Sequence, residues 1–491
     1  MELKPLKYWF WWPIRTYDPF EADTPPVMQA ARNIYATLVS DFIDGKPQGL
    51  IAKEWQVSEN GKIWRFFLRK DLKFEDGTPI TGEIVLLNFK RMLWLTRNEG
   101  LVLNSLLPEV THWKSMHEPS KVVRLENSNE LVFEFVRRPI SLFEAISQPI
   151  YGVAHPKFFD DSGRWKDPLK TLSSGQYAIS DRGPNFVRLK SRDVYSSVDH
   201  APKQVEIMWP LTASDSVVKA IEESRADLTV EHSFALGRET LSKLEKSGVK
   251  YVMEPPVRMH FVHLNHKRGA FKDQAIRQDF RDLFLRRLSS STDFLSSGIT
   301  VDASFIPKGG VGYKKFDLQE YKAKTRHEKS SVDVLIYPFS ADPKIQSSIE
   351  SCLLSSLKDL GLTPNIVRYT ERSEAFNRMK NGEFDVIVRG TGVLVNNPYG
   401  DLRMMFLSAV GANIPDPSGK VPGLIAQAED ESDAAKRAAY VASINEGMFR
   451  DAAIITFAHS GLLYLHRGNV NFTRYNLFAD PIEFRAVGWM P

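Results

Sequence analysis

The sequence predicts a mixed α/β protein with two or more lobes, one of which holds a doubly wound parallel sheet. The chain has 491 residues, more than one hydrophobic core usually organises. Predicted strands and helices alternate along its length, and from residue 332 the order is strand, helix, strand, helix, strand. A composition of 43% hydrophobic and 25% charged residues is typical of a globular chain and not of a disordered one.

The first part of the chain gives strand and helix signals in turn. Residues 7–13 form an aromatic run, which predicts a buried strand that ends at Pro13. Helical spacing follows at residues 29–39, and Thr81 is expected to cap a second helix. Further strands are predicted at residues 62–68, 72–74, 130–135, 176–179, 186–189 and 204–209, and a further helix at residues 214–224.

The later part carries the clearest fold signal. Strands are predicted at residues 334–337, 365–369 and 385–389, and helices between them at residues 345–360 and 373–381. Sheets of this kind bind ligands beyond the carboxyl ends of their strands, which points to Gly390 and the residues after it.

Charge and cysteine content exclude several classes of function. Lys plus Arg number 64 against 60 Asp plus Glu, and the basic residues form no long run, so we expect no nucleic-acid partner. Cys352 is the only cysteine, so neither an internal disulfide nor a cysteine metal cluster can form. It lies on an apolar helical stripe, which predicts a core residue and not a catalytic thiol.

Membrane and export signals are absent from these residues. No run reaches the ~18 consecutive apolar residues of a membrane span, and the first residues lack a basic region, apolar run and cleavage site in that order. Two expectations stay open. Either an export signal lies outside this sequence, with Met1 an added start, or the protein stays in the cytoplasm.

Local signatures of catalysis are not found in the sequence. There is no G-x-S-x-G elbow, H-E-x-x-H helix or Walker loop, and Gly390-Thr391-Gly392 lacks the third glycine of a dinucleotide fingerprint. A strand would place His260 and His263 on opposite faces, so a metal site with His266 is not expected. The acidic run at residues 429–431 is expected to be a solvated helix face. We therefore expect no enzyme, no metal and no cofactor.

Several segments together form a specific pattern. They read NIYATLV at residues 33–39, PQGLIAKEW at 47–55, FLRKDLKFEDGTPIT at 67–81, SGQY at 174–177 and NNP at 396–398. In this order they resemble the extracellular solute-binding proteins of the dipeptide and oligopeptide type, the family that feeds ABC importers. The resemblance covers nearly the whole chain and thins after about residue 407.

The resemblance implies the two-lobed periplasmic-binding-protein fold, or Venus flytrap, with an inserted subdomain in the first lobe. Residues 1–39, 170–258 and 462–491 would form the first lobe, residues 40–169 the inserted subdomain, and residues 259–461 the second lobe. It further implies a monomer in the periplasm that traps a small-molecule or peptide-like ligand between its lobes. The closed form would be recognised by an ABC transporter permease in the inner membrane.

The sequence departs from peptide-binding members of the family where they anchor a ligand. Those members place a carboxylate against the α-ammonium group, and counting back from Pro398 the matching position holds Leu394. An ammonium buried against leucine would keep its desolvation cost and lose its ion pair, so a standard peptide is disfavoured. Asp401 would replace the lost carboxylate if the loop register differs. Thr391 stands where the family has a bulky aromatic residue, and Gly392 follows it; together with Leu394 these changes would widen the site and remove its negative charge.

Other candidates follow from charge and aromatic character. Arg389 either meets an anionic or hydroxyl-rich ligand or points away into a surface salt bridge. Trp11 and Trp12 either stack on ligand or belong to the core, and Tyr151 is a further aromatic candidate. The residues expected to contact the ligand are Trp11, Trp12, Tyr17, Arg389, Gly390, Thr391, Gly392, Leu394, Asn396 and Asn397.

Two further functions remain open from the sequence. A ligand-sensing regulator on the same scaffold would have no transport role, and a cytoplasmic start at Met1 would favour it. An enzyme grown on the scaffold would need an acid and a base that meet in the cleft.

Overall fold

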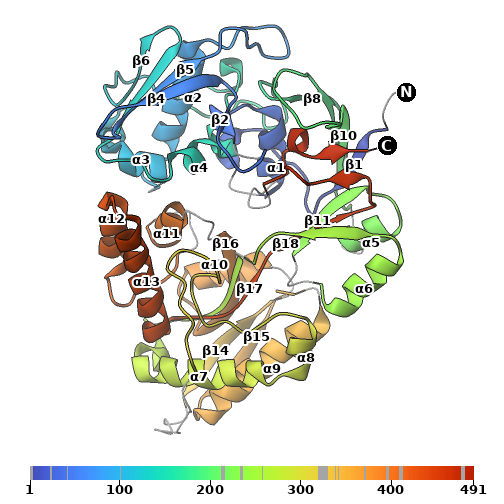
Figure 1. Cartoon of the computed structure of the whole chain (residues 1–491). Helices are drawn as coiled ribbons and strands as arrows, with labels where there is room; N and C mark the ends of the chain where they lie inside the picture. The colour runs from blue at the N-terminus through green and yellow to red at the C-terminus, as the bar shows by residue number, and fades with distance from the viewer. Residues whose placement is uncertain are drawn as a thin grey trace. The chain divides into compact units, whose positions relative to one another are not determined.

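The chain divides into two compact units. The computed structural model describes residues 4–22, 25–40, 43–99, 101–211, 216–232, 236–256, 258–318, 330–337, 339–340, 342–369, 372–393, 398–407, 413–476 and 482–490. The first unit comprises Met1–Val230, Ser247–Val252 and Tyr464–Pro491, and the second comprises Glu231–Lys246 and Met253–Leu463. Their helices and strands are labelled in Figure 1.

A seven-stranded sheet organises the first unit. Its order is β12 (Lys250–Met253), β18 (Leu462–His466), β11 (Leu228–His232), β1 (Leu6–Trp9), β10 (Gln204–Met208), β9 (Phe186–Ser191) and β8 (Tyr177–Gly183). The central strand β1 is parallel to both of its neighbours. Its Leu6, Tyr8 and Trp9 are all buried, as expected for a strand covered on both faces. The chain passes between the units inside β11, β12 and β18.

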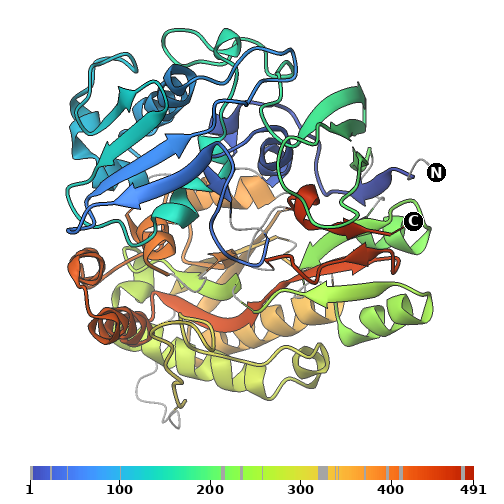
Figure 2. The ribbon, with the colours of Figure 1, turned by 45° about the horizontal axis from the view of Figure 1, so that its top comes forward.

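A second sheet of the first unit is antiparallel and packs against a helix. It has the order β4 (Ala52–Val57), β5 (Ile63–Leu68), β7 (Glu130–Glu134) and β6 (Val123–Asn127), and α2 (Gly82–Leu95) packs against β6 and β7 (Figure 2). The Thr81 hydroxyl accepts a hydrogen bond from the Ile84 N–H and caps α2, as predicted. Phe133 meets Phe66 and Phe89 edge to face in the core between sheet and helix.

The C-terminal segment completes the first unit. Its Ile482 exchanges backbone hydrogen bonds with the amide side chain of Gln29 in α1 (Pro25–Ile34), and the Asn33 amide bonds both Ile482 and Phe484. These groups are buried, so each of these hydrogen bonds replaces a hydrogen bond to water that the group makes in the unfolded chain. The remaining short elements of the unit are β2 (Val39–Ser40), β3 (Gln48–Gly49), α3 (Val102–Leu106), α4 (Leu142–Ile146), α5 (Val217–Glu222), β19 (Val470–Asn471) and β20 (Gly488–Trp489).

The second unit is built on a five-stranded mixed sheet. Its order is β15 (Thr363–Arg368), β14 (Ser331–Ile336), β16 (Val386–Val393), β13 (Arg258–Leu264) and β17 (Ile454–Ser460). Strand β14 is parallel to β15 and β16, which confirms the predicted parallel βαβαβ unit. Strand β13 is antiparallel to both β16 and β17 and extends the sheet beyond it.

Helices cover both faces of this sheet. On one face α7 (Gln274–Ser289) and α9 (Pro343–Asp359) share a core with Val386 and Val388, and on the other Ile387 packs near α10 (Arg372–Lys380). This alternation explains why Val386, Ile387 and Val388, the first three residues of β16, are all apolar. The other helices are α6 (Arg238–Lys246), α8 (Thr292–Ser296), α11 (Pro398–Phe406), α12 (Val421–Asp430) and α13 (Ala434–Asp451).

The structure differs from the sequence predictions at several elements. Strand β1 ends at Trp9 and not at Pro13, and residues 72–74 form only one isolated bridge, between Lys73 and Pro79. Helix α1 ends at Ile34, five residues earlier than the predicted end at residue 39. Cys352 is partly buried against the core that α7 and α9 share.

Candidate functional site

At one edge of the second unit's sheet, residues of three neighbouring strands lie side by side. Arg258, the first residue of β13, pairs with Val393 at the end of β16 and with Ser460 at the end of β17. Strand β14 ends toward the same edge because it is parallel to β16. Carboxyl ends of parallel strands are the usual place for a ligand in such a sheet, so this edge is the candidate site of the second unit.

A histidine–serine pair lies at this edge. The Nε2 atom of His260 is 2.7 Å from the Ser460 Oγ. His260 also pairs in register with Gly390, where a Cβ atom would come within 3.3 Å of its Nδ1. Glycine therefore leaves the imidazole the room that it needs. The sequence predicts an ordinary strand histidine at position 260, and no local signal marks its pairing with Ser460.

Arg389 is buried next to a histidine of the neighbouring strand. Its Nη1 lies 3.3 Å from the Nδ1 of His263, and its guanidinium lies 5.4 Å from the ring centres of Phe261 and Phe376. Burial, and then the Arg389 charge, lower the pKa of His263 well below its ordinary value, so the imidazole is neutral at pH 7. A neutral Nδ1 accepts a hydrogen bond from Arg389, which holds the cation in one orientation.

The remaining predicted residues of this edge are described only in part. Gly390, Thr391 and Gly392 belong to β16, which ends at Val393. Leu394, Asn396 and Asn397 lie outside the described residues. Asp401 lies in the first turn of α11.

In the first unit, an aromatic run follows the end of β1. The ring centres of Phe10 and Trp11 are 5.1 Å apart, and those of Trp11 and Trp12 are 5.6 Å apart. Phe10 is buried, Trp11 is partly buried and Trp12 is 50% exposed. The exposed indole of Trp12, next to the buried ring of Phe10 and the partly buried ring of Trp11, is a surface on which an apolar molecule or the face of a sugar can stack.

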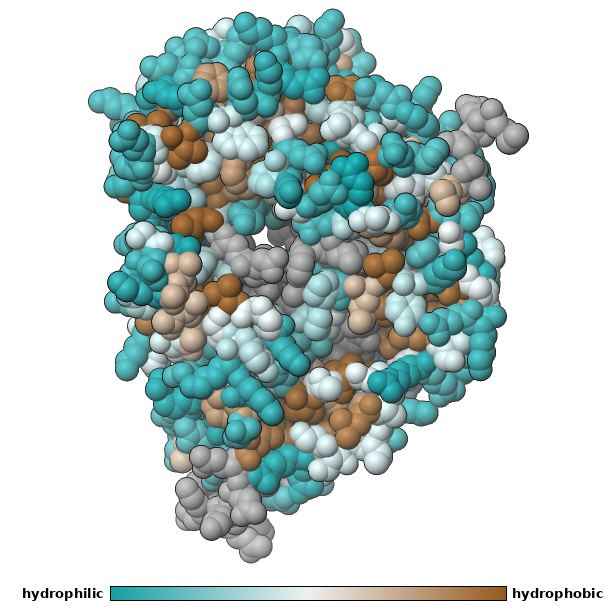
Figure 3. Space-filling model, viewed as in Figure 1, coloured by the Kyte–Doolittle hydropathy of each residue, from teal (hydrophilic) through white to brown (hydrophobic). Residues whose placement is uncertain are grey.

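The face drawn in Figure 3 is mostly hydrophilic, with hydrophobic residues in small groups.

The two tyrosine candidates lie in packed surroundings. Tyr17 is 3% exposed, and its backbone carbonyl accepts a hydrogen bond from the Tyr35 hydroxyl. Tyr151 is 5% exposed and stacks on Phe89, with ring centres 5.7 Å apart. Burial raises the pKa of both phenols. Tyr151 thus serves the core of the second sheet in the first unit.

Other predicted chemical groups have structural partners. Glu429, expected on a solvated face, is buried and accepts two hydrogen bonds from the Arg403 guanidinium, at 2.8 and 2.7 Å. The expectation is wrong for Glu429, because α11 and α12 pack together and enclose the pair, whereas Asp430 is exposed. Within the described ranges, no group of three or more His, Cys, Asp or Glu side chains could hold a metal ion. No helix among the residues that the structure describes is long and apolar enough to cross a membrane.

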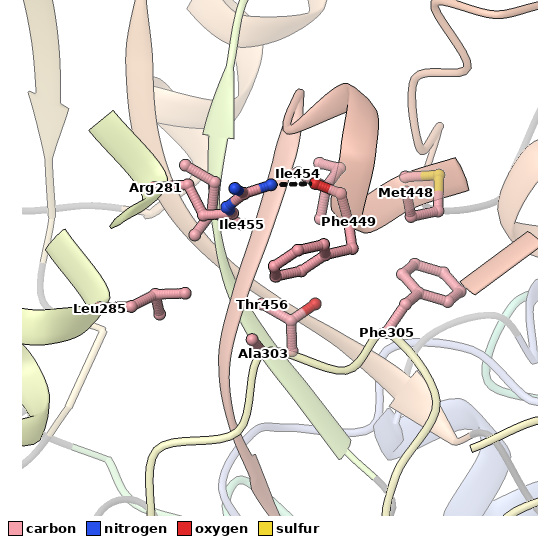
Figure 4. Close-up of a pocket in the computed structure, with 9 residues that line it drawn as sticks. All are labelled: Arg281, Leu285, Ala303, Phe305, Met448, Phe449, Ile454, Ile455 and Thr456. Carbon is pink, nitrogen blue, oxygen red and sulfur yellow. Dashed lines mark hydrogen bonds between the residues drawn. The ribbon is translucent and has the colours of Figure 1, made fainter. Parts of the chain in front are cut away.

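A small pocket in the second unit lies away from the candidate edge. Figure 4 shows Arg281 donating a hydrogen bond to the Phe449 carbonyl, with Leu285, Met448 and Phe305 beside them. It has room for about one water molecule, far less than the volume of a ligand site. The pocket is therefore too small to be the ligand site.

Comparison with known sequences assigns most of the chain to one family. The sequence model described as "Bacterial extracellular solute-binding proteins, family 5 Middle" matches residues 46–413. The periplasmic oligopeptide-binding protein OppA of Salmonella typhimurium is 20% identical, over 90% of this chain and 84% of that protein. The probable D,D-dipeptide-binding periplasmic protein DdpA of Escherichia coli is 24% identical, over 76% and 72%. The nickel-binding periplasmic protein of Escherichia coli is 20% identical, over 78% and 74%.

Solved structures share the fold. OppA of Haemophilus influenzae in complex with the peptide RPPGFSPFR matches with a TM-score of 0.79 and 16% identity over all of both chains. NikA of Brucella suis in complex with Fe(III)-EDTA matches with a TM-score of 0.77 and 17% identity over 98% of this chain and 99% of that one. The predicted two-lobed periplasmic-binding-protein fold is thereby confirmed.

Proposed function

Because the chain belongs to the bacterial extracellular solute-binding proteins of family 5, we propose that it captures a small solute and delivers it to the permease of an ABC importer. The family match over residues 46–413 carries this proposal. The passage of the chain between its two units inside three strands supports it, since strands of this kind can act as a hinge. We further propose that the protein works as a monomer in the periplasm, where its named relatives OppA and DdpA act.

The proposed ligand is not a standard peptide. Leu394 stands where peptide-binding members carry the carboxylate that anchors an α-ammonium group. Leucine can offer an ammonium neither an ion pair nor a hydrogen bond, so a buried free amine would stay unsatisfied. The ligand is instead anionic or rich in hydroxyl groups.

The Arg389–His263 arrangement supports an anionic or hydroxyl-rich ligand. Arg389 directly precedes Gly390 in the middle of β16, and the neutral His263 does not offset its positive charge. A guanidinium fixed in one orientation attracts an anion at lower entropic cost than a mobile side chain. In the first unit, Trp11 and Trp12 are the proposed stacking surface, and Tyr17 contributes its backbone to their loop.

Thermal-shift measurements test the ligand class. The native protein is screened against organic acids, oligosaccharides, and tripeptides with free and acetylated amines, because a ligand that binds only the native state raises the melting temperature by mass action. We expect shifts with members of the first two groups. A large shift with free-amine tripeptides and none with the acetylated forms would contradict the role given to Leu394.

A pair of variants makes the test sharper. Leu394→Asp restores a carboxylate at the anchoring position, and Leu394→Asn is the matched neutral control. We expect Leu394→Asp alone to gain a thermal shift with free-amine tripeptides. Equal responses of the two variants would show that position 394 does not face the ligand.

A further inference from the structure

A second small cavity lies inside the first unit, and none of the residues that line it is among those proposed to bind the solute. Unlike the pocket of Figure 4, it is lined largely by polar side chains, with room for about one water molecule. Its lining includes Arg32, Tyr35, Gln176, Tyr195, Glu483 and Arg485. Such a cavity holds a guest only if the lining offers it hydrogen bonds.

Arg485 provides the unmet hydrogen-bonding group. The residue is 2% exposed. Its Nε donates to the Glu483 carboxylate and its Nη1 donates to the Ser196 carbonyl at 2.6 Å. Its Nη2 is buried and has no hydrogen-bond partner among the described residues. A buried charged donor without an acceptor costs free energy. A guest that accepts a hydrogen bond from Nη2 would remove this cost.

The other polar groups around the cavity are fixed by bonds of their own. The second carboxylate oxygen of Glu483 accepts from the Ser40 hydroxyl at 3.1 Å. The Gln176 Oε1 accepts from the Tyr195 N–H at 2.9 Å, and the Tyr195 hydroxyl donates to the Ser174 carbonyl at 3.0 Å. Because these groups are held in place, they cannot turn to satisfy Arg485, and the cavity keeps its shape.

Nearby charges make the cavity favourable for electron-rich guests. Burial is the main cause that raises the pKa of Tyr195, but Arg192, Arg69 and Arg485 all act to lower it, and only Asp71 opposes them. The cations therefore set a positive potential at a side chain that lines the cavity. Glu483 adds a negative charge to the lining of the cavity. Both oxygens of its carboxylate, however, already accept hydrogen bonds.

We propose that this cavity is an internal binding site for one small hydrogen-bond acceptor, a water molecule or a halide ion, held by the Nη2 of Arg485. The guest completes the bonding of a guanidinium in the C-terminal segment. It thereby joins that segment to α1 and to the turn before β8, which contribute Arg32 and Gln176 to the lining.

Diffraction from crystals of the full chain tests the site and tells the two guests apart. Crystals are grown in sodium bromide and in a halide-free salt, and anomalous data are collected for the bromide form. A peak within hydrogen-bonding distance of Nη2 with anomalous signal identifies a halide, and one without it identifies water; both support the site. An empty cavity at a resolution that shows other ordered waters overturns the proposal, as does a protein acceptor on Nη2.

Thermal melting of two variants adds a second readout. Arg485→Lys keeps the charge but removes the Nη2 donor, and Arg474→Lys changes an arginine paired with Asp44 in an exposed bond of the same unit. We expect Arg485→Lys to lose the guest and to melt several degrees lower, and Arg474→Lys to melt near the native protein. If the guest is a halide, added bromide raises the native melting temperature and not that of Arg485→Lys. A guest that stays in place in Arg485→Lys contradicts the role of Nη2. If that variant does not fold, diffraction from the native chain still tests the proposal.

Discussion

The Nη2 of Arg91 donates hydrogen bonds to both carboxylate oxygens of Asp18, at 2.9 and 2.7 Å, and both side chains are buried. The Arg91 Nε donates to the Gly163 carbonyl at 2.8 Å, and its guanidinium lies 4.9 Å from the ring centre of Phe159. This ion pair joins α2 to the loop that carries Tyr17. The position of Tyr17, a candidate for binding the ligand, therefore depends on an ion pair that the surrounding side chains shield from water.

Asp18→Asn should destabilise the first unit strongly. The substitution keeps the shape of the side chain but leaves the Arg91 charge buried without its counter-ion, which costs about 3–5 kcal/mol. Urea denaturation followed by circular dichroism measures the loss. Asp44→Asn, which removes an exposed partner of Arg474, is the matched control and should change stability little. Similar losses in both variants would mean that burial does not set the cost.

His459 should make the second unit less stable in acid. Burial lowers the pKa of His459 from 6.5 to about 4 in the folded protein. The unfolded chain therefore binds a proton more readily, and stability present above pH 6.5 is lost as the pH falls toward 4. For this residue the loss amounts to about 3 kcal/mol.

The variant His459→Gln isolates this dependence because glutamine does not titrate. Denaturation midpoints at pH 7, 5.5 and 4 should fall less steeply in the variant than in the native protein. His117→Gln, at an exposed position, should keep the native slope. An unchanged slope in His459→Gln would show that other groups cause the loss in acid.

Gly390→Ala should disturb the candidate edge through His260. The added Cβ would lie 3.3 Å from the His260 Nδ1, so the ring must give way by a few tenths of an ångström, which disturbs its contact with Ser460 at a cost of about 1–2 kcal/mol. In a His260→Ala background the nearest remaining atom to the added Cβ is the Met259 carbonyl oxygen at 3.5 Å, an ordinary contact, so the same substitution should be nearly neutral. A double-mutant cycle measures this coupling, and additive effects would contradict the crowding.

Removal of residues 482–491 should open the first unit and spare the second. The deletion leaves the buried amides of Gln29 and Asn33 without their partners at Ile482 and Phe484. Limited proteolysis with mass spectrometry should find early cleavage within residues 1–230 and later cleavage within residues 253–463. A chain that lacks only residues 490–491 is the control, and equal protection of both deletions would contradict the prediction.

Local patterns in the sequence predict much of the second unit. The helix predicted at residues 345–360 is α9, Pro343–Asp359, because its apolar stripe Ile345, Ile349, Leu353 and Leu357 has helical spacing and is fully buried. Thr81 caps α2 as predicted, because an N-cap needs only residues within one turn. Features that depend on near neighbours can be predicted from the sequence.

Strand ends and buried pairs depend on distant residues. The aromatic run at residues 7–13 predicts a strand through Pro13, but β1 ends at Trp9, where β10 also ends at its partner Met208. Arg389 and His263 are 126 positions apart, and Arg403 and Glu429 are 26 apart. No local pattern marks such pairs, so neither the orientation of Arg389 nor the burial of Glu429 could be predicted.

The threading of the chain through β11, β12 and β18 limits how such a protein can evolve. The boundaries of the units fall after Val230, Lys246, Val252 and Leu463, so neither unit is encoded by one uninterrupted stretch of gene. A single recombination event cannot exchange one unit and keep the other intact. Substitution within an existing pair of units does not meet this constraint, and the two units then inherit their changes together.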